Sequence, residues 1–229
     1  VELLNDAGFH AGTEGMGLDE EQRILLLRRS ATVFHEAYRK AKGKKYWADK
    51  TPTYVRCLPG LFRLMGSQAK WLFIFRHPMD VAYSIWKRGW NSGNQADFAE
   101  DPLGATCRYV AECAQLQLQL IRRLSTENGQ IVYYDQWVEA PEPHLRKFCE
   151  WYGVPFSERM LAYADQPHDF GCEDPVVRGT AGFSPSHGNW KAWRLDEQAR
   201  AWEILAEAAH ALGFEQDDPR VRRPIHLGP

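Results

Sequence analysis

One stretch of the sequence decides the fold: KWLFIFRHPMDVAYS, residues 70–84. It contains five apolar residues in a row, from Trp71 to Phe75, a run typical of a strand buried on both faces of a parallel sheet. Pro78 then stands where a proline favours the beginning of a helix. A strand that leads at once into a helix indicates an α/β fold. Arg76 lies at the carboxyl end of this strand, where open α/β sheets bind their ligands.

Outside this stretch, predicted helices and strands alternate. Helical spacing of apolar residues predicts long helices over residues 19–43, 103–124, 141–152 and 195–212. A second buried strand is predicted over residues 130–134. The shorter predictions are a helix end closed by Gly8, a loop over 11–18, a strand over 46–48 and a polar loop over 91–102. Together these elements favour an α/β fold with a mostly parallel sheet.

Overall composition narrows the classes of function. The chain has 229 residues without an internal repeat or a long linker, so the sequence predicts a single domain over residues 1–229. With 28 basic and 30 acidic residues we expect no nucleic-acid partner, and no apolar run reaches the roughly 20 residues of a membrane helix. Five cysteines without a C-x-x-C pair indicate reduced thiols and a cytoplasmic location. The scattered histidines predict no metal site.

The residues after the strand have the chemistry of an anion site. Arg76 offers a planar fork of donors that suits a phosphate or a sulfate. Ser84 and Arg88 lie one helical step apart on the helix that follows, so they share a face. The other interpretation of the same pattern is structural: Arg76 pairs with Asp80, and Ser84 only fills a helix position.

The pattern of a strand followed by Arg-x-Pro-x-Asp-x-x-x-Ser resembles the 3′-phosphate-binding segment of the sulfotransferases that use PAPS, 3′-phosphoadenosine 5′-phosphosulfate. The resemblance implies that Arg76 and Ser84 hold the 3′-phosphate of the donor. In members similar to tyrosylprotein sulfotransferases an arginine four residues beyond the serine joins them, and Arg88 stands at that position.

Three more segments resemble the same family, in the same order along the chain. WADKTP, residues 47–52, is similar to a segment whose lysine stabilises the transferring sulfuryl group, which implies that role for Lys50. YYDQWV, residues 133–138, implies that Tyr134 contacts the adenine side of the donor. GNWK, residues 188–191, is similar to a loop that folds over the 3′-phosphate, which implies contacts for three residues: Gly188, Trp190 and Lys191.

The resemblance implies a three-layer fold of the P-loop type, with a central, mostly parallel sheet flanked by helices. It also implies in-line transfer of a sulfuryl group from PAPS to a hydroxyl or an amine, without a metal. The acceptor would be a small molecule, a peptide or a glycan. Members of the family begin with a strand and a Ser/Thr-Gly-rich loop that binds the 5′-phosphosulfate. This sequence lacks both, so we expect them to precede Val1.

The general base and two other classes of protein stay open. His10, Glu14 and Asp49 are the candidates for the base, with His10 preferred. One alternative is a kinase-like enzyme on the same type of fold, although the sequence contains no G-x-x-x-x-G-K-[ST] loop. The other is a relative that binds nucleotides without catalysis.

Overall fold

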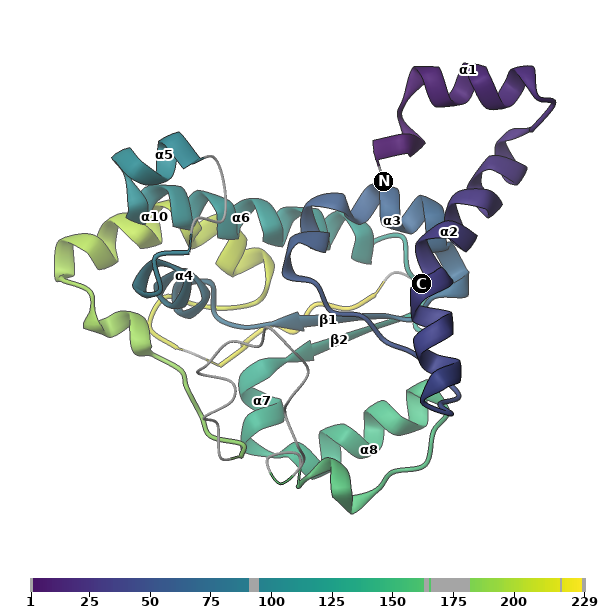
Figure 1. Ribbon diagram of the computed structural model, residues 1–229. Coiled ribbons are helices and arrows are strands. Elements are labelled where there is room, and N and C mark those ends of the chain that lie inside the picture. The colour runs from purple at the N-terminus through teal and green to yellow at the C-terminus, as the bar shows by residue number, and fades with distance from the viewer. Residues whose placement is uncertain (1, 91–94, 163–164, 166–181, 219, 228–229) are drawn as a thin grey trace. The chain divides into compact units, whose positions relative to one another are not determined.

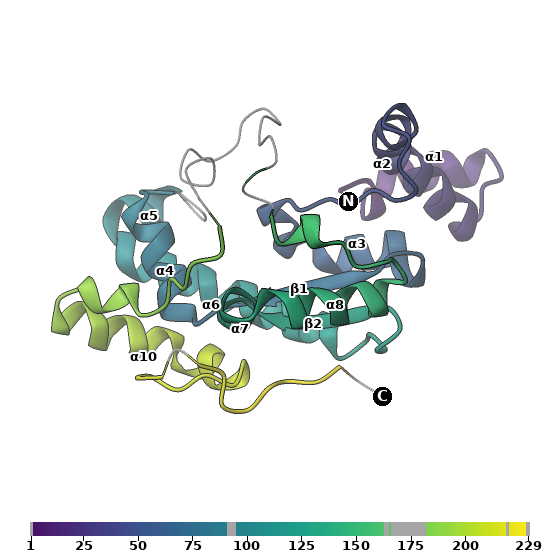
Figure 2. The same ribbon diagram turned by 90° about the horizontal axis from the view of Figure 1, so that it is seen from below.

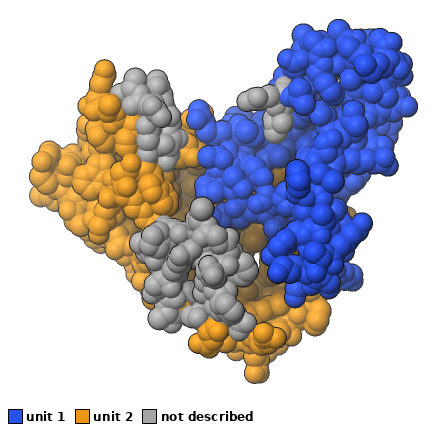
Figure 3. Space-filling view, viewed as in Figure 1, with its two compact units in different colours: residues 1–69, 116–123 blue, residues 70–115, 124–229 orange. Residues whose placement is uncertain are grey.

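The computed structural model spans residues 1–229 and describes the chain outside residues 1, 91–94, 163–164, 166–181, 219 and 228–229 (Figure 1). The chain divides into two compact units (Figure 3). Unit 1 comprises residues 1–69 and 116–123, and unit 2 comprises residues 70–115 and 124–229. That the chain forms a single domain stays a prediction.

Helices make up most of the described structure. The α-helices are α1 (Ala7–Gly15), α2 (Glu20–Ala41), α3 (Leu58–Met65), α4 (Pro78–Lys87), α5 (Gln95–Glu100), α6 (Pro102–Ile121), α7 (Tyr134–Glu139), α8 (Pro141–Tyr152) and α10 (Leu195–Ala211). The 3-10 helices are η1 (Glu2–Leu4), η2 (Pro52–Cys57), η3 (Gly66–Gln68), η4 (Glu158–Met160) and η6 (Asn189–Ala192). The strands are β1 (Trp71–Phe75) and β2 (Gly129–Tyr133).

In unit 1, α2 begins where the sequence predicts. Asp19 caps it, because its carboxylate accepts the backbone N–H of Gln22 at 2.8 Å, while the Gln22 side chain accepts the N–H of Asp19 at 3.0 Å. Farther along α2, the Nε of Arg28 donates to the Leu64 carbonyl of α3 at 2.6 Å. This hydrogen bond joins the two helices across a long sequence separation.

The N-terminal helix lies farther along the chain than the sequence predicts. Because α1 runs from Ala7 to Gly15, the predictions of a helix end at Gly8 and of a loop over 11–18 are wrong. The glycines of α1 lower its helix propensity, so its pattern resembles a loop. Asp6 compensates as N-cap, since its carboxylate accepts the N–H of Phe9 at 2.6 Å.

Residues 46–48 do not form the predicted strand. Trp47 stacks on His35 of α2 with 4.4 Å between the ring centroids. Its indole N–H donates to the Glu36 carboxylate at 2.8 Å. The aromatic residue that suggests a strand thus packs along a helix instead.

The prediction of a loop over residues 91–102 is also wrong in part. α5 occupies residues 95–100, whereas residues 91–94 lie outside the described chain. The next helix, α6, begins at Pro102, and the Asp101 carboxylate accepts the N–H of Gly104 at 3.0 Å. Helix α5 is too short for its apolar residues to show a helical period.

Unit 2 contains a parallel sheet, which β1 and β2 form among the described residues. Trp71 is aligned with Gly129, and Phe75 with Tyr133. Parallel neighbours need a long crossover connection, and the chain between these strands contains α4, α5 and α6. The predicted α/β fold with a parallel sheet is therefore confirmed.

β1 is buried on one face only, so the prediction of burial on both faces is wrong. Phe73 and Phe75 are 4% and 3% exposed, whereas Leu72 and Ile74 are 38% and 54% exposed. This alternation is the period of two that a pleated strand imposes. A continuous apolar run does not reveal such a difference, because both faces of β1 carry the same type of residue.

The core of unit 2 lies where α4, α6, η6 and α10 meet. Figures 1 and 2 both show α4 and α10 close to the first part of α6. The buried residues of this core are Met79, Ala82, Leu103, Cys107, Val110, Trp190, Trp193, Ala201 and Leu205. Since α4 begins directly after β1, the core fixes the segment that carries Arg76. None of the described helices is long and apolar enough to cross a membrane.

Candidate functional site

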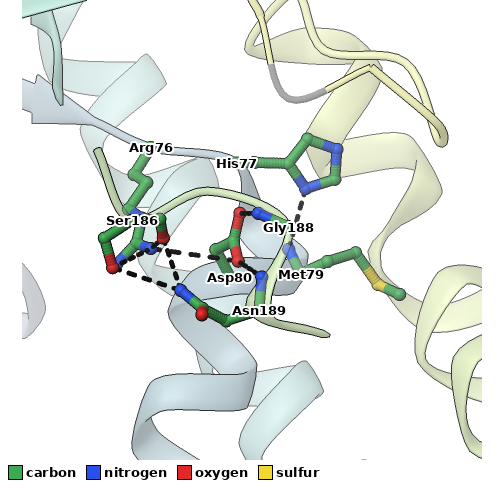
Figure 4. A network of polar contacts seen from close by, with 7 residues as sticks. All are labelled: Arg76, His77, Met79, Asp80, Ser186, Gly188 and Asn189. Atoms are coloured by element: carbon green, nitrogen blue, oxygen red, sulfur yellow. Dashed lines mark hydrogen bonds and ion pairs between the residues drawn. The ribbon is translucent and has the colours of Figure 1, made fainter. Parts of the chain in front are cut away.

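Arg76 follows the last residue of β1 and is the centre of a polar network in unit 2 (Figure 4). Its guanidinium donates from Nη2 to the carbonyl oxygen of Ser186, and lies 3.3 Å from the Ser186 hydroxyl. The guanidinium also lies over the ring of Tyr134, 5.3 Å from its centroid. The structure thus brings together two of the predicted donor-binding residues, Arg76 and Tyr134, at the carboxyl ends of neighbouring parallel strands.

Asp80 is the second centre of this network. One oxygen of its carboxylate accepts the backbone N–H of Gly188 at 2.9 Å, and the other accepts the N–H of Asn189 at 2.7 Å. An Asp80 oxygen also lies 3.8 Å from Nη2 of Arg76. The pairing of Arg76 with Asp80, which the sequence offers as the structural interpretation, is therefore present. It leaves the anion-binding interpretation open, because the Asp80 oxygen lies beyond hydrogen-bond distance of Nη2, which donates to Ser186 instead.

Residues 186–189 form the loop that faces Arg76. Gly188 has a φ of +76°, a conformation that glycine adopts without steric cost. The Asn189 side-chain amide donates to the Ser186 carbonyl at 2.5 Å and to its hydroxyl at 3.1 Å. Trp190, the next residue, is 3% exposed and packs in the core, so the core holds one end of the loop. Lys191 is exposed, with its ammonium 5.7 Å from the centroid of the Trp190 ring.

His77, next to Arg76, has a structural position. Its Nδ1 accepts the N–H of Met79 at 3.2 Å at the start of α4 (Figure 4). Because a carbonyl only accepts, Nε2 carries the proton and donates to the carbonyl of Glu215 at 3.0 Å. Burial lowers the pKa of this fully buried imidazole. His77 therefore connects the turn after β1 to the segment after α10.

The sequence does not single out Asp135, a buried residue in the first turn of α7. Burial raises the pKa of its carboxyl, and the nearby Arg76 charge opposes this shift. Its Oδ1 has no hydrogen-bond partner among the described residues. Ser186, Asn189 and the role of Asp80 are not predicted either. Asp80 belongs to the Arg-x-Pro-x-Asp pattern and Asn189 to the GNWK segment, whereas Ser186 lies just before that segment and in no pattern.

Ser84 and Arg88 lie on α4 and at its C-cap, as the helical spacing predicts. Ser84 is half-buried, and none of the hydrogen bonds among the described residues joins it to Arg76. The guanidinium of Arg88 lies over the ring of Trp90, 4.6 Å from its centroid. The structure therefore places both residues on the helix that follows the site and leaves their contact with a donor as a prediction.

A polar cavity of about 850 Å³ opens beside His187 of the loop. Acidic and basic side chains both line it, including Glu139 at the end of α7, Glu215, Asp218 and Arg222. Asp218 is paired with Arg222. The cavity thus extends from the loop to the C-terminal segment of unit 2.

The candidate catalytic residues Lys50 and Asp49 lie in unit 1, between α2 and η2. Lys50 is exposed. Asp49 accepts a hydrogen bond from the Tyr54 hydroxyl at 2.6 Å and lies 3.3 Å from Nε2 of His35. The Tyr54 hydroxyl, and then His35, lower the pKa of the Asp49 carboxyl. These contacts hold the irregular segment on which Lys50 lies.

The other candidates for the base lie on α1. Nε2 of His10 is 2.8 Å from the carbonyl oxygen of Leu4, so Nε2 carries the proton in the neutral ring and Nδ1 has the free lone pair. His10 is half-buried. Glu14 is exposed on the same helix.

The residues around Arg76 fit an anion attached to a planar group. The guanidinium provides charge and paired donors, and Nε of Arg76 is buried without a hydrogen-bond partner among the described residues. The Tyr134 ring offers a surface beside it for stacking. Within the described part of the chain, no group of three or more His, Cys, Asp or Glu residues is arranged to hold a metal ion.

Comparison with known proteins agrees with this chemistry. The family model described as the sulfotransferase family matches residues 4–158, more than half of the chain. The chain belongs to the sulfotransferase family. The match includes Arg76 and Tyr134 of this sulfotransferase-family protein, whereas the loop over residues 186–189 lies beyond it.

Solved structures show the same fold. The sulfotransferase domain of the olefin synthase from Synechococcus PCC 7002 is 20% identical, with a TM-score of 0.64 over 81% of this chain and 64% of that domain. The sulfotransferase domain from the curacin biosynthetic pathway is 20% identical, with a TM-score of 0.61 over 80% of this chain and 68% of that domain. The sulfotransferase-family chain thus spans about two thirds of each domain. No curated protein matches it.

Proposed function

We propose that this protein transfers a sulfuryl group from PAPS to a hydroxyl or an amine of an acceptor. One observation carries the proposal: the Arg76 guanidinium lies at the carboxyl end of β1, between the Tyr134 ring and the loop over residues 186–189. A planar guanidinium matches the oxygens of a phosphate, and an aromatic ring suits a purine. A nucleotide that carries a phosphate on its ribose offers both groups.

In this proposal Arg76 exchanges the carbonyl of Ser186 for oxygens of the 3′-phosphate. Ser84 on α4, Arg88 at its C-cap and Lys191 after the loop add donors to the same phosphate. Gly188 and Trp190 shape the loop, and Tyr134 faces the adenine. The exchange favours the ligand, because a charged oxygen accepts a stronger hydrogen bond from a guanidinium than a neutral carbonyl does.

The proposed chemistry is an in-line displacement. The acceptor oxygen or nitrogen forms a bond to sulfur while the bond from sulfur to the 5′-phosphate oxygen breaks, and adenosine 3′,5′-bisphosphate leaves. Lys50 stabilises the charge on the sulfuryl oxygens. His10 takes the acceptor proton at Nδ1, since its Nε2 proton is donated to Leu4. Asp49 is a weaker base, because the hydrogen bond from Tyr54 lowers the pKa of its carboxyl.

Calorimetric titration of the full protein with adenosine 3′,5′-bisphosphate tests the donor site, with AMP as the reference ligand. We expect the bisphosphate to bind with micromolar affinity and AMP to bind at least about tenfold more weakly. The reason is that a charge-assisted hydrogen bond contributes about 1.5–3 kcal/mol. Arg76→Ala should abolish the preference. The control is Arg146→Ala. Arg146 lies on α8, and in the described part of the chain its ion pair is with Glu142.

Equal binding of the bisphosphate and AMP would contradict the proposal. The family match would then reflect common ancestry without the donor site, and the kinase-like or non-catalytic alternative would take its place. Retention of the preference in Arg76→Ala would contradict the assignment of Arg76. Loss of the preference in Arg146→Ala would show that the assay reports stability instead of the site.

A further inference from the structure

Asp80 makes an unusual set of contacts for a residue in the first turn of a helix. Its side chain is fully buried. Its two oxygens each accept one backbone N–H of the facing loop, from Gly188 at 2.9 Å and from Asn189 at 2.7 Å. The same carboxylate lies 3.8 Å from the Arg76 guanidinium (Figure 4). One side chain therefore contacts both walls of the proposed phosphate site.

The loop offers a cradle for an anion, and Asp80 fills it. Gly188 has a φ of +76°, which turns its own N–H and the next one toward the same carboxylate. Successive N–H groups in such a turn bind negative charge. A buried carboxylate needs this compensation, because burial without donors or a paired cation carries a large free-energy penalty.

Helix α4 does not need Asp80 as its cap. Nδ1 of His77 already accepts the N–H of Met79 at the start of the helix. The carboxylate of Asp80 is instead directed across to a loop more than 100 residues away in the sequence. Its contacts therefore connect the loop to the segment that carries Arg76, and contribute little to capping the helix.

We propose that Asp80 is a positioning residue for the 3′-phosphate of the donor, an inference that rests on the proposed function. By binding Gly188 and Asn189 it holds the loop over residues 186–189 in place before the donor arrives. By its closeness to Arg76 it orients the guanidinium toward that loop. Asp80 does not touch the donor itself. It sets the spacing of the groups that do.

The test compares Asp80→Asn with the unchanged protein in titrations with adenosine 3′,5′-bisphosphate and AMP. The variant keeps the shape of the side chain. Its NH₂ group, a donor, faces one of the loop N–H donors, so one of the two hydrogen bonds is lost. Arg76 also loses its negatively charged neighbour. We expect the bisphosphate-to-AMP affinity ratio to fall about tenfold or more, as for the loss of a hydrogen bond to a charged group. AMP binding should stay within about twofold, because AMP lacks the 3′-phosphate.

Asp101→Asn is the matched control. Asp101 also accepts a backbone N–H at the start of a helix, from Gly104 at 3.0 Å, and pairs with Arg200 at 2.6 Å. It takes no part in the described network around Arg76. Asp101→Asn should lower the melting temperature and leave the affinity ratio unchanged. A fall of the ratio in both variants would overturn the proposal, because general destabilisation would then explain the effect.

Amide hydrogen exchange gives a readout that needs no ligand. Asp80→Asn should raise the exchange rates of the Gly188 and Asn189 amides about tenfold or more and leave the core amide of Leu205 unchanged. If the exchange rates of the Gly188 and Asn189 amides stay the same in Asp80→Asn, the positioning role is overturned. This result does not depend on the proposed function. It holds even if the protein without the substitution shows no preference for the bisphosphate. Should Asp80→Asn not fold, Asp80→Glu keeps the charge and displaces it by one methylene. An unaltered affinity ratio in this variant would also overturn the proposal.

Discussion

At the scale of single residues, His77 shows how a titratable group is used for structure. It is fully buried, accepts a hydrogen bond at the start of α4 and donates one to the segment after α10. Both contacts require the neutral ring with its proton on Nε2. Protonation would add a hydrogen to Nδ1, which would then point at the N–H of Met79. It would also place a positive charge in the core.

His77 therefore predicts a loss of stability in acid. Burial lowers the pKa of His77 in the folded protein, whereas the unfolded chain keeps the ordinary value of about 6.5. As the pH falls below that value, the unfolded state binds a proton that the folded state does not, and the free energy of unfolding decreases until the pH passes the folded pKa. At pH 7.5 and above this contribution is fully present.

The variant His77→Asn keeps a side chain that caps helices well and removes the titration. Thermal unfolding at pH 7.5 and at pH 5.5 measures the effect. We expect the variant to melt at a lower temperature than the original protein at pH 7.5. From pH 7.5 to pH 5.5, however, its melting temperature should fall by a few degrees less, since about 1 kcal/mol corresponds to about 2–4 °C in a chain of this size. The exposed His226→Asn is the control and should keep the original decrease. An unchanged decrease in His77→Asn would contradict the prediction.

At the scale of elements, two glycines that end helices make a matched pair. Gly153 ends α8 with a φ of +80°, and a Cβ there would meet no atom within 4 Å. Gly213 follows α10 with a φ of +86°, and a Cβ there would collide with the carbonyl oxygen of Arg223. Both sites therefore require the left-handed conformation, but only Gly213 also lies against another segment of backbone.

Gly153→Ala should lower the free energy of unfolding by about 1–2 kcal/mol, the strain of alanine in the left-handed region. Gly213→Ala should lower it by about 3 kcal/mol or more, because the clash displaces the C-terminal segment as well. Urea denaturation of both variants measures the difference. Equal losses would show that the segment after α10 yields to the added methyl group.

These helix ends also show which elements a single sequence predicts. Gly153, Gly213 and Pro78 lie at helix ends that the sequence predicts within a few residues, because each has a backbone preference of its own. α1 is not predicted, since its glycines disfavour a helix and the Asp6 cap alone is a weak signal. The exposed face of β1 is not predicted either, because exposure depends on what packs against the strand.

At the scale of the whole molecule, the candidate site combines local and distant residues. Arg76 is predictable because the strand, the turn and Pro78 are adjacent in the sequence. Its partner Ser186 is 110 residues away and in no recognised pattern, so one sequence contains no signal for that contact. Lys50 and His10 belong to unit 1, whereas Arg76 and Tyr134 belong to unit 2. Their roles in one reaction therefore remain proposals.

Burial in the core of unit 2 should make the Cys107 thiol unreactive in the folded protein. Cys107 of α6 is completely buried in this core, and burial raises its pKa to about 12. Because the thiolate is the reactive form, iodoacetamide should modify Cys107 only when unit 2 unfolds, and a change from pH 7 to pH 9 should have little effect. The half-buried Cys57 of unit 1 should react faster, because reagent can reach it in the folded protein. Mass spectrometry of timed samples measures both rates, and equal rates would contradict the prediction.

Helix α2 differs from the helices of that core in one respect that affects how the protein melts. Over its 22 residues none is buried, and Phe34 is 80% exposed. A helix with so little buried apolar surface is held mainly by its caps and by hydrogen bonds such as that from Arg28 to Leu64. Such a segment opens at a lower free energy than a buried one. The first helical signal lost on warming should therefore come from α2, before the cooperative transition of unit 2.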